Sequence, residues 1–222
     1  MAKQSPHPEP SPRLYLISPR LDEATGFAPA LTSALQANDV ACVLLNLGAA
    51  DPGAAKKIIL TLAPLVQQRG AALIVDCDSR LVLRSGADGV HLRVSGDGLQ
   101  QAVAEAVESL KPDHIVGIAG IRTRHDAMTA GEQDIDYIMF GEPARDGWTP
   151  PLDKRLEQAA WWSEIFNVPC VVYAASLDEV AELAASGADF VALGDAIWSD
   201  PRGPAAAVSD ATAALKAPAR SA

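Results

Sequence analysis

The segment SGADGVHL (85–92) and its near copy SGADFVAL (186–193) decide how the rest of the chain is interpreted. In each copy small residues lead into a glycine, then an aspartate, then an apolar run. Glycine commonly ends a helix and aspartate suits a turn, so each copy predicts a helix-to-strand turn. The turn itself is then structural. The residues after each strand, RVSGDG and GDAIW, lie at the opposite end of the strand, where function is expected.

Short runs rich in Val, Ile and Leu recur along the chain, with little polar alternation. Such runs are typical of parallel strands covered on both faces. The runs are 14–18, 41–47, 71–76, 89–93, 114–120, 137–141, 169–174 and 190–196. Amphipathic helical patterns lie between them. Eight strands alternating with helices predict a (β/α)8 TIM barrel, whose functional face is formed by the strand C-terminal ends.

A doubly wound open sheet is the alternative architecture. That fold binds nucleotides through a G-x-G-x-x-G segment after its first strand, and the sequence has none there. We therefore predict a single barrel domain over 13–216. The Pro- and Ser-rich start, 1–12, and the end, 217–222, are predicted to be disordered tails.

The charge of the chain limits its partners. Eighteen basic and 28 acidic residues give a net charge of −10, which repels nucleic acid and anionic membranes. No apolar stretch reaches the length of a membrane helix. The three cysteines, Cys42, Cys77 and Cys170, are widely spaced, which is not typical of a disulfide framework or a zinc site and predicts a cytoplasmic protein. A small anion could still be held by backbone N–H groups.

The chain resembles the thiamine phosphate synthase and thiazole tautomerase (TenI) group of barrels over residues 13–215. The resemblance rests on the order of LYLIS (14–18), GADGVHL (86–92), HIVGIAG (114–120), DYIMFG (136–141) and GADFVALGDAIW (187–198). It implies a mouth that joins a pyrimidine diphosphate to a thiazole phosphate with release of pyrophosphate, using Mg²⁺. It also implies a homodimer.

The motifs that carry chemistry in that family are altered here. Its second strand ends in Gln-x-Arg-x-Lys, whereas this chain has LLNLGAAD (44–51), without a cation. Its third strand ends in Asn-Asp, and those positions fall on Asp76 and Cys77. Its Gly-Gln-x-Asp after the fourth strand becomes RVSGDG (93–98), which displaces Asp97. The later segments GIA (117–119), EPARDGWTPP (142–151), AAS (174–176) and GDAI (194–197) also differ from the family pattern.

Asp76 and Asp97 are the candidate metal ligands, with Asp78 beside them. Carboxylates at neighbouring strand ends meet at one mouth, and Mg²⁺ takes oxygen ligands. The alternative is solvated turn aspartates, with Asp78 or Ser79 capping a helix. The thiol at Cys77 and the displaced Asp97 predict weak or absent magnesium binding. Mg²⁺ is therefore a candidate cofactor but not an assigned one.

Glu142 and Arg122 are the candidate catalytic residues. Glu142 directly follows the sixth strand in a long loop, where a general base could lie, and Arg122 follows the fifth strand in GIRTRHDAM (120–128). The alternative for the loop that begins at Glu142 is a lid without a chemical role. The alternative for GIRTRHDAM is that Arg122 and His125 lie at the exposed start of a helix. In the tautomerases a catalytic histidine lies in that second loop, but the register here places Ile121 or Arg122 nearest to it.

Arg93, Arg145, Gly194 and Ala196 are the candidate ligand contacts. Barrels often hold phosphate through backbone N–H groups after the eighth strand, although Asp195 would repel a phosphate there. His91, inside the fourth strand, is interpreted as a hydrogen-bonded core residue.

Three functions share this fold, so the fold cannot choose among them. The motifs favour a barrel that acts on or binds a small phosphorylated or heterocyclic compound, with synthase activity weakened by the altered diphosphate and metal motifs. A working thiamine phosphate synthase is the second hypothesis. A non-catalytic ligand-binding or regulatory barrel is the third.

Overall fold

A computed structural model describes residues 11–47, 51–76, 78–144 and 147–217. Its parallel strands form a closed barrel in the order β1 to β8, with β8 paired to β1. The strands are β1 (Arg13–Leu21), β2 (Cys42–Leu47), β3 (Ala72–Val75), β4 (Gly89–Arg93), β5 (Ile115–Ala119), β6 (Tyr137–Phe140), β7 (Cys170–Ala174) and β8 (Phe190–Leu193). The predicted (β/α)8 barrel is confirmed, and the open sheet is excluded.

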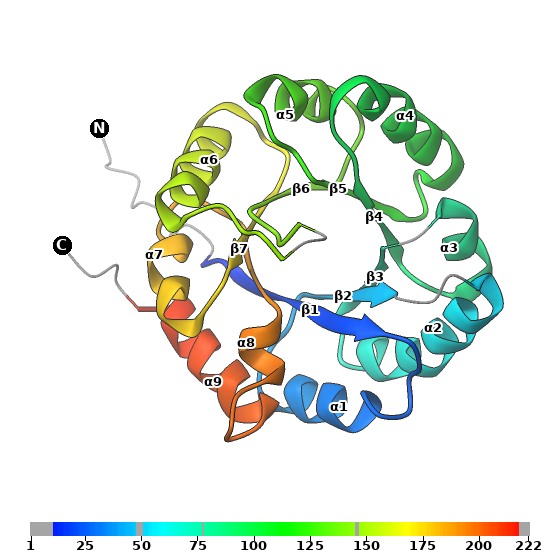
Figure 1. Ribbon diagram of the computed structural model, residues 1–222, viewed down its shortest axis with the longest axis vertical. Coiled ribbons are helices and arrows are strands. Elements are labelled where there is room, and N and C mark those ends of the chain that lie inside the picture. The colour runs from blue at the N-terminus through cyan, green and yellow to red at the C-terminus, as the bar shows by residue number, and fades with distance from the viewer. Residues whose placement is uncertain (1–10, 48–50, 77, 145–146, 218–222) are drawn as a thin grey trace, which may run out of the picture.

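Helices surround the barrel as an outer ring (Figure 1). They are α1 (Ala28–Ala37), α2 (Pro52–Gln67), α3 (Ser79–Ser85), α4 (Leu99–Leu110), α5 (Arg124–Gly131), α6 (Leu152–Ile165), α7 (Val180–Ala184), α8 (Asp195–Trp198) and α9 (Pro204–Leu215). The short 3₁₀ turns η1 (Gly96–Gly98) and η2 (Leu177–Glu179) precede α4 and α7. None of the described helices is long and apolar enough to span a membrane.

Both faces of the strands are buried, which explains their continuous apolar sequence. Along β1, Leu14 and Leu16 belong to the large core between strands and helices, whereas Tyr15 and Ile17 belong to a second cluster. Because successive side chains of a strand point to opposite faces, this second cluster fills the barrel interior. The interior cluster contains three tyrosines, so polar hydroxyl groups lie within an otherwise apolar core.

The repeated Gly-Ala-Asp turn is structural, as predicted. Gly86 ends α3 in the left-handed conformation, with φ 76°, which glycine adopts without strain. The aspartate that follows accepts a hydrogen bond from the backbone N–H of the preceding strand, and a third turn repeats the arrangement. These bonds run from Leu73, Val116 and Cys170 to Asp88, Asp136 and Asp189 over 2.7, 2.7 and 2.8 Å. The three aspartates therefore fix neighbouring strands at the N-terminal end of the barrel.

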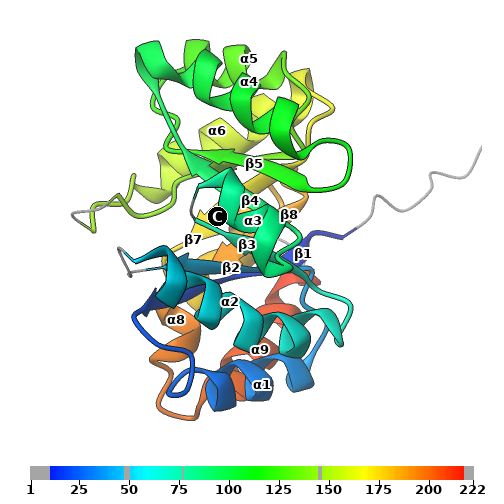
Figure 2. The same ribbon diagram turned by 90° about the vertical axis from the view of Figure 1, so that its right-hand side faces the viewer.

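The opposite end of the barrel, at the strand C-terminal ends, is the mouth. The β6–α6 segment projects from this side, and β1 begins at the other (Figure 2). The predicted eighth strand was too long, because β8 ends at Leu193 and α8 begins at Asp195. Of the predicted tails, residues 1–10 and 218–222 lie outside the described residues.

Candidate active site

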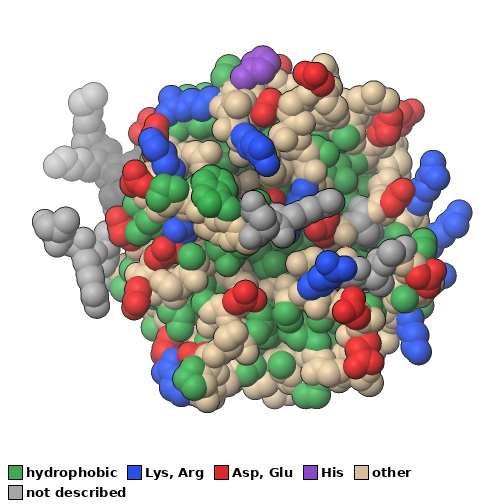
Figure 3. Space-filling model, in the orientation of Figure 1, with side chains coloured by type: hydrophobic (Ala, Val, Ile, Leu, Met, Phe, Trp, Pro, Cys, Tyr) green, Lys and Arg blue, Asp and Glu red, His purple; other side chains and the backbone are tan. Residues whose placement is uncertain are grey.

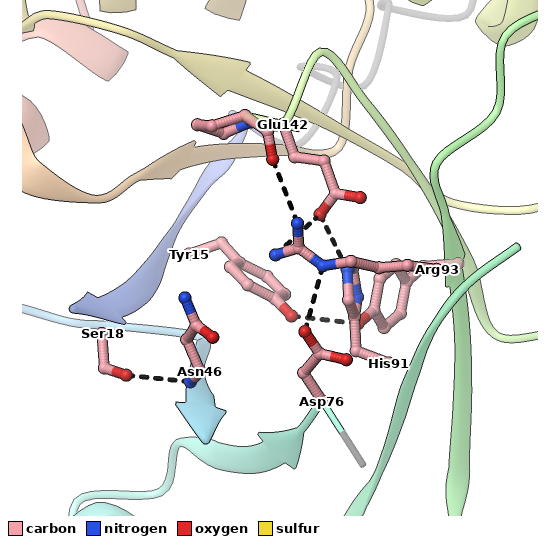
Figure 4. A network of polar contacts seen from close by, with 9 residues as sticks. Tyr15, Ser18, Asn46, Asp76, His91, Arg93 and Glu142 are labelled. Atoms are coloured by element: carbon pink, nitrogen blue, oxygen red, sulfur yellow. Dashed lines mark hydrogen bonds and ion pairs between the residues drawn. The ribbon is translucent and has the colours of Figure 1, made fainter. Parts of the chain in front are cut away.

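Three of the predicted residues meet at the mouth (Figure 4). Asp76 directly follows β3, Arg93 is the last residue of β4, and Glu142 follows β6 by two residues. Arg93 Nε lies 3.1 Å from Asp76 Oδ2, and Arg93 Nη2 lies 3.4 Å from Glu142 Oε2. One guanidinium is therefore shared by two carboxylates that come from different strands.

The two contacts of Arg93 differ in kind. The Nε atom of Arg93 is buried and makes no hydrogen bond. Its 3.1 Å distance to Asp76 Oδ2 is therefore that of an ion pair without a hydrogen bond. By contrast, Nη1 donates a hydrogen bond of 3.0 Å to the carbonyl oxygen of Pro143. Arg93 thus connects the ends of β3 and β4 to the start of the β6–α6 loop, and it holds Glu142 and Pro143 in place.

Glu142 also contacts His91, which lies deeper in the barrel. The Glu142 side chain is only 6% exposed, and its Oε2 lies 2.9 Å from Nε2 of His91, which is fully buried. The other ring nitrogen, Nδ1, lies 2.8 Å from the Tyr137 hydroxyl. None of the described residues donates a hydrogen bond to the second oxygen, Oε1. The described residues therefore fix the carboxylate of Glu142 through Oε2.

The hydrogen-bonded chain continues into the barrel interior. The hydroxyl groups of Tyr137 and Tyr15 lie 2.9 Å apart, and both rings are buried. Burial raises the pKa of both phenols well above the usual value, so both remain protonated at neutral pH. The chain Tyr15–Tyr137–His91–Glu142 therefore runs from the barrel interior to the mouth and restrains the histidine ring on both nitrogens.

Gly117 makes room for this chain. A Cβ atom added at Gly117, in β5, would lie 1.9 Å from the Tyr137 ring. The glycine that in sequence stands at the family's Gly-x-Ser position thus has a packing role here. We expect Gly117→Ala to push the Tyr137 ring away and to lower the free energy of unfolding by about 1–3 kcal/mol, as overpacked cores do. Urea denaturation measures this change.

Gly98→Ala is the matched control for that substitution. A Cβ at Gly98 meets nothing within 4 Å, so its effect should stay within about 0.5 kcal/mol. Equal effects of the two substitutions would show that the Tyr137 ring does not depend on the space beside Gly117.

The ends of β1 and β2 supply uncharged polar groups to the same mouth. Ser18 Oγ donates to the carbonyl oxygen of Pro19 and accepts the backbone N–H of Asn46 over 2.9 Å. The Asn46 side-chain amide points toward the space between Tyr15 and Asp76 (Figure 4). An amide there offers a ligand one hydrogen-bond acceptor and two donors.

The end of β7 holds a buried ion pair that was not predicted from the sequence. Arg155, near the start of α6, is 2% exposed and contacts both carboxylate oxygens of Glu179, over 2.8 and 2.9 Å. It also donates to the carbonyl oxygens of Tyr173 and Pro150. The pair fastens the β6–α6 loop to the β7–α7 turn. The sequence does carry one signal for Glu179 that the sequence analysis did not use. Ser176 and Glu179 form the Ser-x-x-Glu pattern, which is typical of a helix N-terminus.

Glu179 in turn satisfies the backbone of the β7–α7 turn. Its Oε2 accepts the N–H of Ala175 over 2.6 Å, and the backbone of Ser176 also contacts the carboxylate. Partial burial opposes ionisation of Glu179, but the hydrogen bonds from Arg155 and Ala175 outweigh it. The pKa of Glu179 therefore lies below its usual value, and the carboxylate is ionised at neutral pH.

The other predicted residues that the structure describes do not join this network. Arg122 is exposed between β5 and α5, and no carboxylate of the described chain pairs with it. Asp97 is exposed in η1, while Gly194 and Ala196 flank the start of α8. Arg145 and Cys77 lie outside the described residues. Acidic and basic side chains both surround the barrel axis on this face (Figure 3).

Comparisons with known proteins agree with the fold and the resemblance. A family model described as thiamine monophosphate synthase matches residues 14–197. A protein named thiamine-phosphate synthase from Rhodospirillum centenum is 41% identical over 200 residues, covering 89% of this chain and 95% of that protein. Another of that name from Hyphomonas neptunium is 34% identical over 211 residues, covering 90% and 92%.

The barrel also resembles a solved structure. Thiamine phosphate pyrophosphorylase from Pyrococcus furiosus superposes with a TM-score of 0.75 at 20% identity, covering 92% of this chain and 95% of that one. At this identity the structural likeness supports the fold alone, whereas the family match and the two relatives support kinship. This chain belongs to the thiamine monophosphate synthase family.

Proposed function

We propose that this chain binds a small phosphorylated or heterocyclic compound in the barrel mouth and that Glu142 exchanges a proton with it. One observation carries the proposal. Glu142 is fixed through Oε2 by His91 and Arg93, while no described residue hydrogen-bonds its Oε1. A carboxylate held in this way needs no reorganisation before it accepts a proton from a ligand.

The same network argues against efficient synthase chemistry. Departure of pyrophosphate builds negative charge that cations must meet. Arg93 already lies between the carboxylates of Asp76 and Glu142, so its charge is largely neutralised within the protein. The end of β2 contributes the uncharged amide of Asn46, and the segment LLNLGAAD (44–51) has no arginine or lysine, unlike the family's Gln-x-Arg-x-Lys. Such a mouth is better suited to binding and proton transfer than to release of a diphosphate.

The side chains also fit Mg²⁺ poorly. Asp76 is engaged by Arg93, and Asp97 is exposed on a separate turn. Within the described ranges, no three His, Cys, Asp or Glu side chains come together in a group able to hold a metal ion. Hard divalent cations need several oxygen ligands at fixed positions. The proton transfer proposed for Glu142 therefore does not involve magnesium.

A binding barrel without turnover is the second candidate. This candidate is favoured because the polar groups of Arg93, His91 and Tyr137 already form ion pairs or hydrogen bonds with other residues of the protein. The two candidates differ in one measurable respect. Only the first requires that Glu142 move a proton to or from the bound compound.

Hydrogen exchange on the bound compound separates the two candidates. The protein is incubated in D₂O with the thiazole alcohol, the aminopyrimidine alcohol and their phosphate esters, and NMR follows exchange of carbon-bound protons. We expect exchange in at least one compound, reduced about 100-fold or more by Glu142→Gln, since the amide cannot act as a base. Calorimetry should show that the variant still binds.

Glu164→Gln is the control, because this exposed side chain on α6 carries the same charge change away from the mouth. Binding without any exchange would support the non-catalytic candidate. Exchange that is equally fast in Glu142→Gln would remove Glu142 from the proposal.

A further inference from the structure

We infer that His91 is a positioning residue for Glu142, kept as a neutral donor by hydrogen bonds that run from the barrel interior toward the mouth. In this arrangement the hydroxyls of Tyr15 and Tyr137 donate along the chain and Nδ1 of His91 accepts. The Nε2–H group of His91 then donates to Glu142. The effect on Glu142 rests on the proposed function, whereas the protonation of His91 can be measured in the protein without any ligand.

Strand register brings His91 and Tyr137 to one level of the barrel interior. His91 in β4 pairs with Gly117 in β5, and Gly117 pairs with Tyr137 in β6. Because Gly117 has no side chain, the Tyr137 ring fits beside it, where an added Cβ would lie 2.4 Å from the hydroxyl oxygen. The centroids of the His91 and Tyr137 rings are 5.9 Å apart, and the ring planes are inclined by 25°. The register and the missing side chain together place the Tyr137 hydroxyl against Nδ1 of His91.

The contact between His91 and Glu142 requires a proton on Nε2. A carboxylate only accepts hydrogen bonds, and Arg93 Nη2 lies 3.4 Å from the same oxygen as its ion-pair partner. The 2.9 Å contact between His91 Nε2 and Glu142 Oε2 is therefore a hydrogen bond that Nε2 donates. A lone pair on Nε2 would face the lone pairs of the carboxylate, and the two groups would repel one another.

The two tyrosines supply the donors for the rest of the chain. Burial raises the pKa of both phenols, so each oxygen keeps its proton and can donate it. When Tyr15 donates to Tyr137 over 2.9 Å, the Tyr137 proton points at His91 Nδ1, 2.8 Å away. Nδ1 then accepts and carries no proton of its own. Every hydrogen bond of the chain is in this way directed toward Glu142.

The opposite direction requires a charged ring. Tyr137 could accept a hydrogen bond from Nδ1 only if both nitrogens of His91 carried protons, since Nε2 already donates to Glu142. His91 is fully buried, and the Glu142 carboxylate already has the Arg93 guanidinium as an ion-pair partner. A buried charge is costly unless it has a partner of its own. We therefore assign a neutral ring with its proton on Nε2.

A neutral donor suits the role proposed for Glu142. An imidazolium would stabilise the carboxylate by its charge and so weaken it as a base, whereas a neutral imidazole adds one hydrogen bond and no charge. The restraint is also directional, because the ring is held on both nitrogens and its Nε2–H points at Oε2. His91 thus orients the carboxylate without neutralising it.

Nitrogen-15 NMR of the ligand-free protein tests the protonation of His91. The protein is labelled at the histidine ring nitrogens, and His91→Gln identifies the His91 signals among those of the chain's four histidines. We expect Nε2 to carry a directly bonded hydrogen, and Nδ1 to be unprotonated and shifted by a hydrogen bond. Protons on both nitrogens at neutral pH, or a proton on Nδ1 alone, would overturn the inference.

Tyr137→Phe removes the hydroxyl that donates to Nδ1 and keeps the ring. We expect the Nδ1 signal to move to the position of a ring nitrogen without a hydrogen bond, while Nε2 stays protonated. Tyr173→Phe is the matched control, because it removes a hydroxyl of the same interior cluster that lies beside Gly194 instead. Should Tyr137→Phe fail to fold, Tyr15→Phe is used, for which we expect a smaller shift in the same direction. An Nδ1 signal unchanged by loss of the hydroxyl would show that Tyr137 is not the donor and overturn the inference.

Two substitutions of His91 test the positioning itself in the hydrogen-exchange assay. Glutamine places an amide N–H near the position of Nε2, whereas asparagine reaches only as far as Nδ1. We expect His91→Gln to keep exchange within about tenfold of the wild type and His91→Asn to lose about 100-fold, with the compound still bound by both. Equal losses would contradict a positioning role. If the wild type shows no exchange, the proposed function fails, and the labelled spectra alone decide the inference.

Discussion

Purified and supplied with the pyrimidine diphosphate, the thiazole phosphate and Mg²⁺, the protein should form thiamine phosphate at less than about 1% of the rate of an intact synthase. Loss of one preorganised partner of developing charge commonly lowers a rate about a hundredfold. Here the segment LLNLGAAD (44–51) at the end of β2 contains no arginine or lysine, and Arg93 lies between Asp76 and Glu142, so we expect this charge to be poorly met. Several such changes combine, although not additively.

A family member that retains the Gln-x-Arg-x-Lys segment serves as the positive control for this assay. Growth of a strain lacking its own synthase gives a second readout. Turnover within about tenfold of the control would mean that other cations, such as Arg122, meet the charge on pyrophosphate. The mouth would then be suited to diphosphate release after all, contrary to what we propose.

The largest loss of stability is expected from Arg155→Met. The guanidinium is buried and contacts Glu179 and two carbonyl oxygens. Removing one partner of a buried ion pair leaves an uncompensated charge, which typically lowers the free energy of unfolding by about 3–5 kcal/mol. Urea denaturation followed by circular dichroism measures this difference.

Arg124→Met is the matched control, because Arg124 pairs with Glu157 on the surface, where both side chains are more than half exposed. Surface pairs contribute about 1 kcal/mol or less. A double variant, Arg155→Met with Glu179→Leu, should recover part of the loss, since no buried charge is left unpaired. An effect of Arg155→Met no larger than that of Arg124→Met would show that the buried pair does not stabilise the mouth.

The sequence predicted the barrel well because its strands are buried on both faces and their apolar runs are therefore uninterrupted. It also placed Asp76, Arg93 and Glu142 at one mouth, since the ends of parallel strands meet. The end of β8 was predicted too far along, because Gly194 and Ala196 continue an apolar run although α8 begins at Asp195. A run of small residues of this kind is compatible with both a strand and a helix.

The pairing of the polar side chains could not be predicted in the same way. His91 was correctly interpreted as a hydrogen-bonded core residue. Nothing in the local pattern indicated that its partners would be Glu142 and Tyr137, because those contacts depend on strand register and rotamers across the barrel. The interior tyrosines resemble ordinary apolar strand residues in the sequence. Arg155 lies in the pattern of an amphipathic helix, where an arginine is normally exposed, and only the fold buries it.

A small heterocycle should bind within the mouth, between the strand ends that carry Asn46, Asp76 and Glu142. A crystal structure of the protein soaked with the aminopyrimidine or thiazole alcohol tests this binding position most directly. We expect electron density for the ring at this position, within hydrogen-bond distance of the Glu142 carboxylate. Density for the compound elsewhere, with the mouth network of Asp76, Arg93 and Glu142 unchanged, would contradict the proposed site.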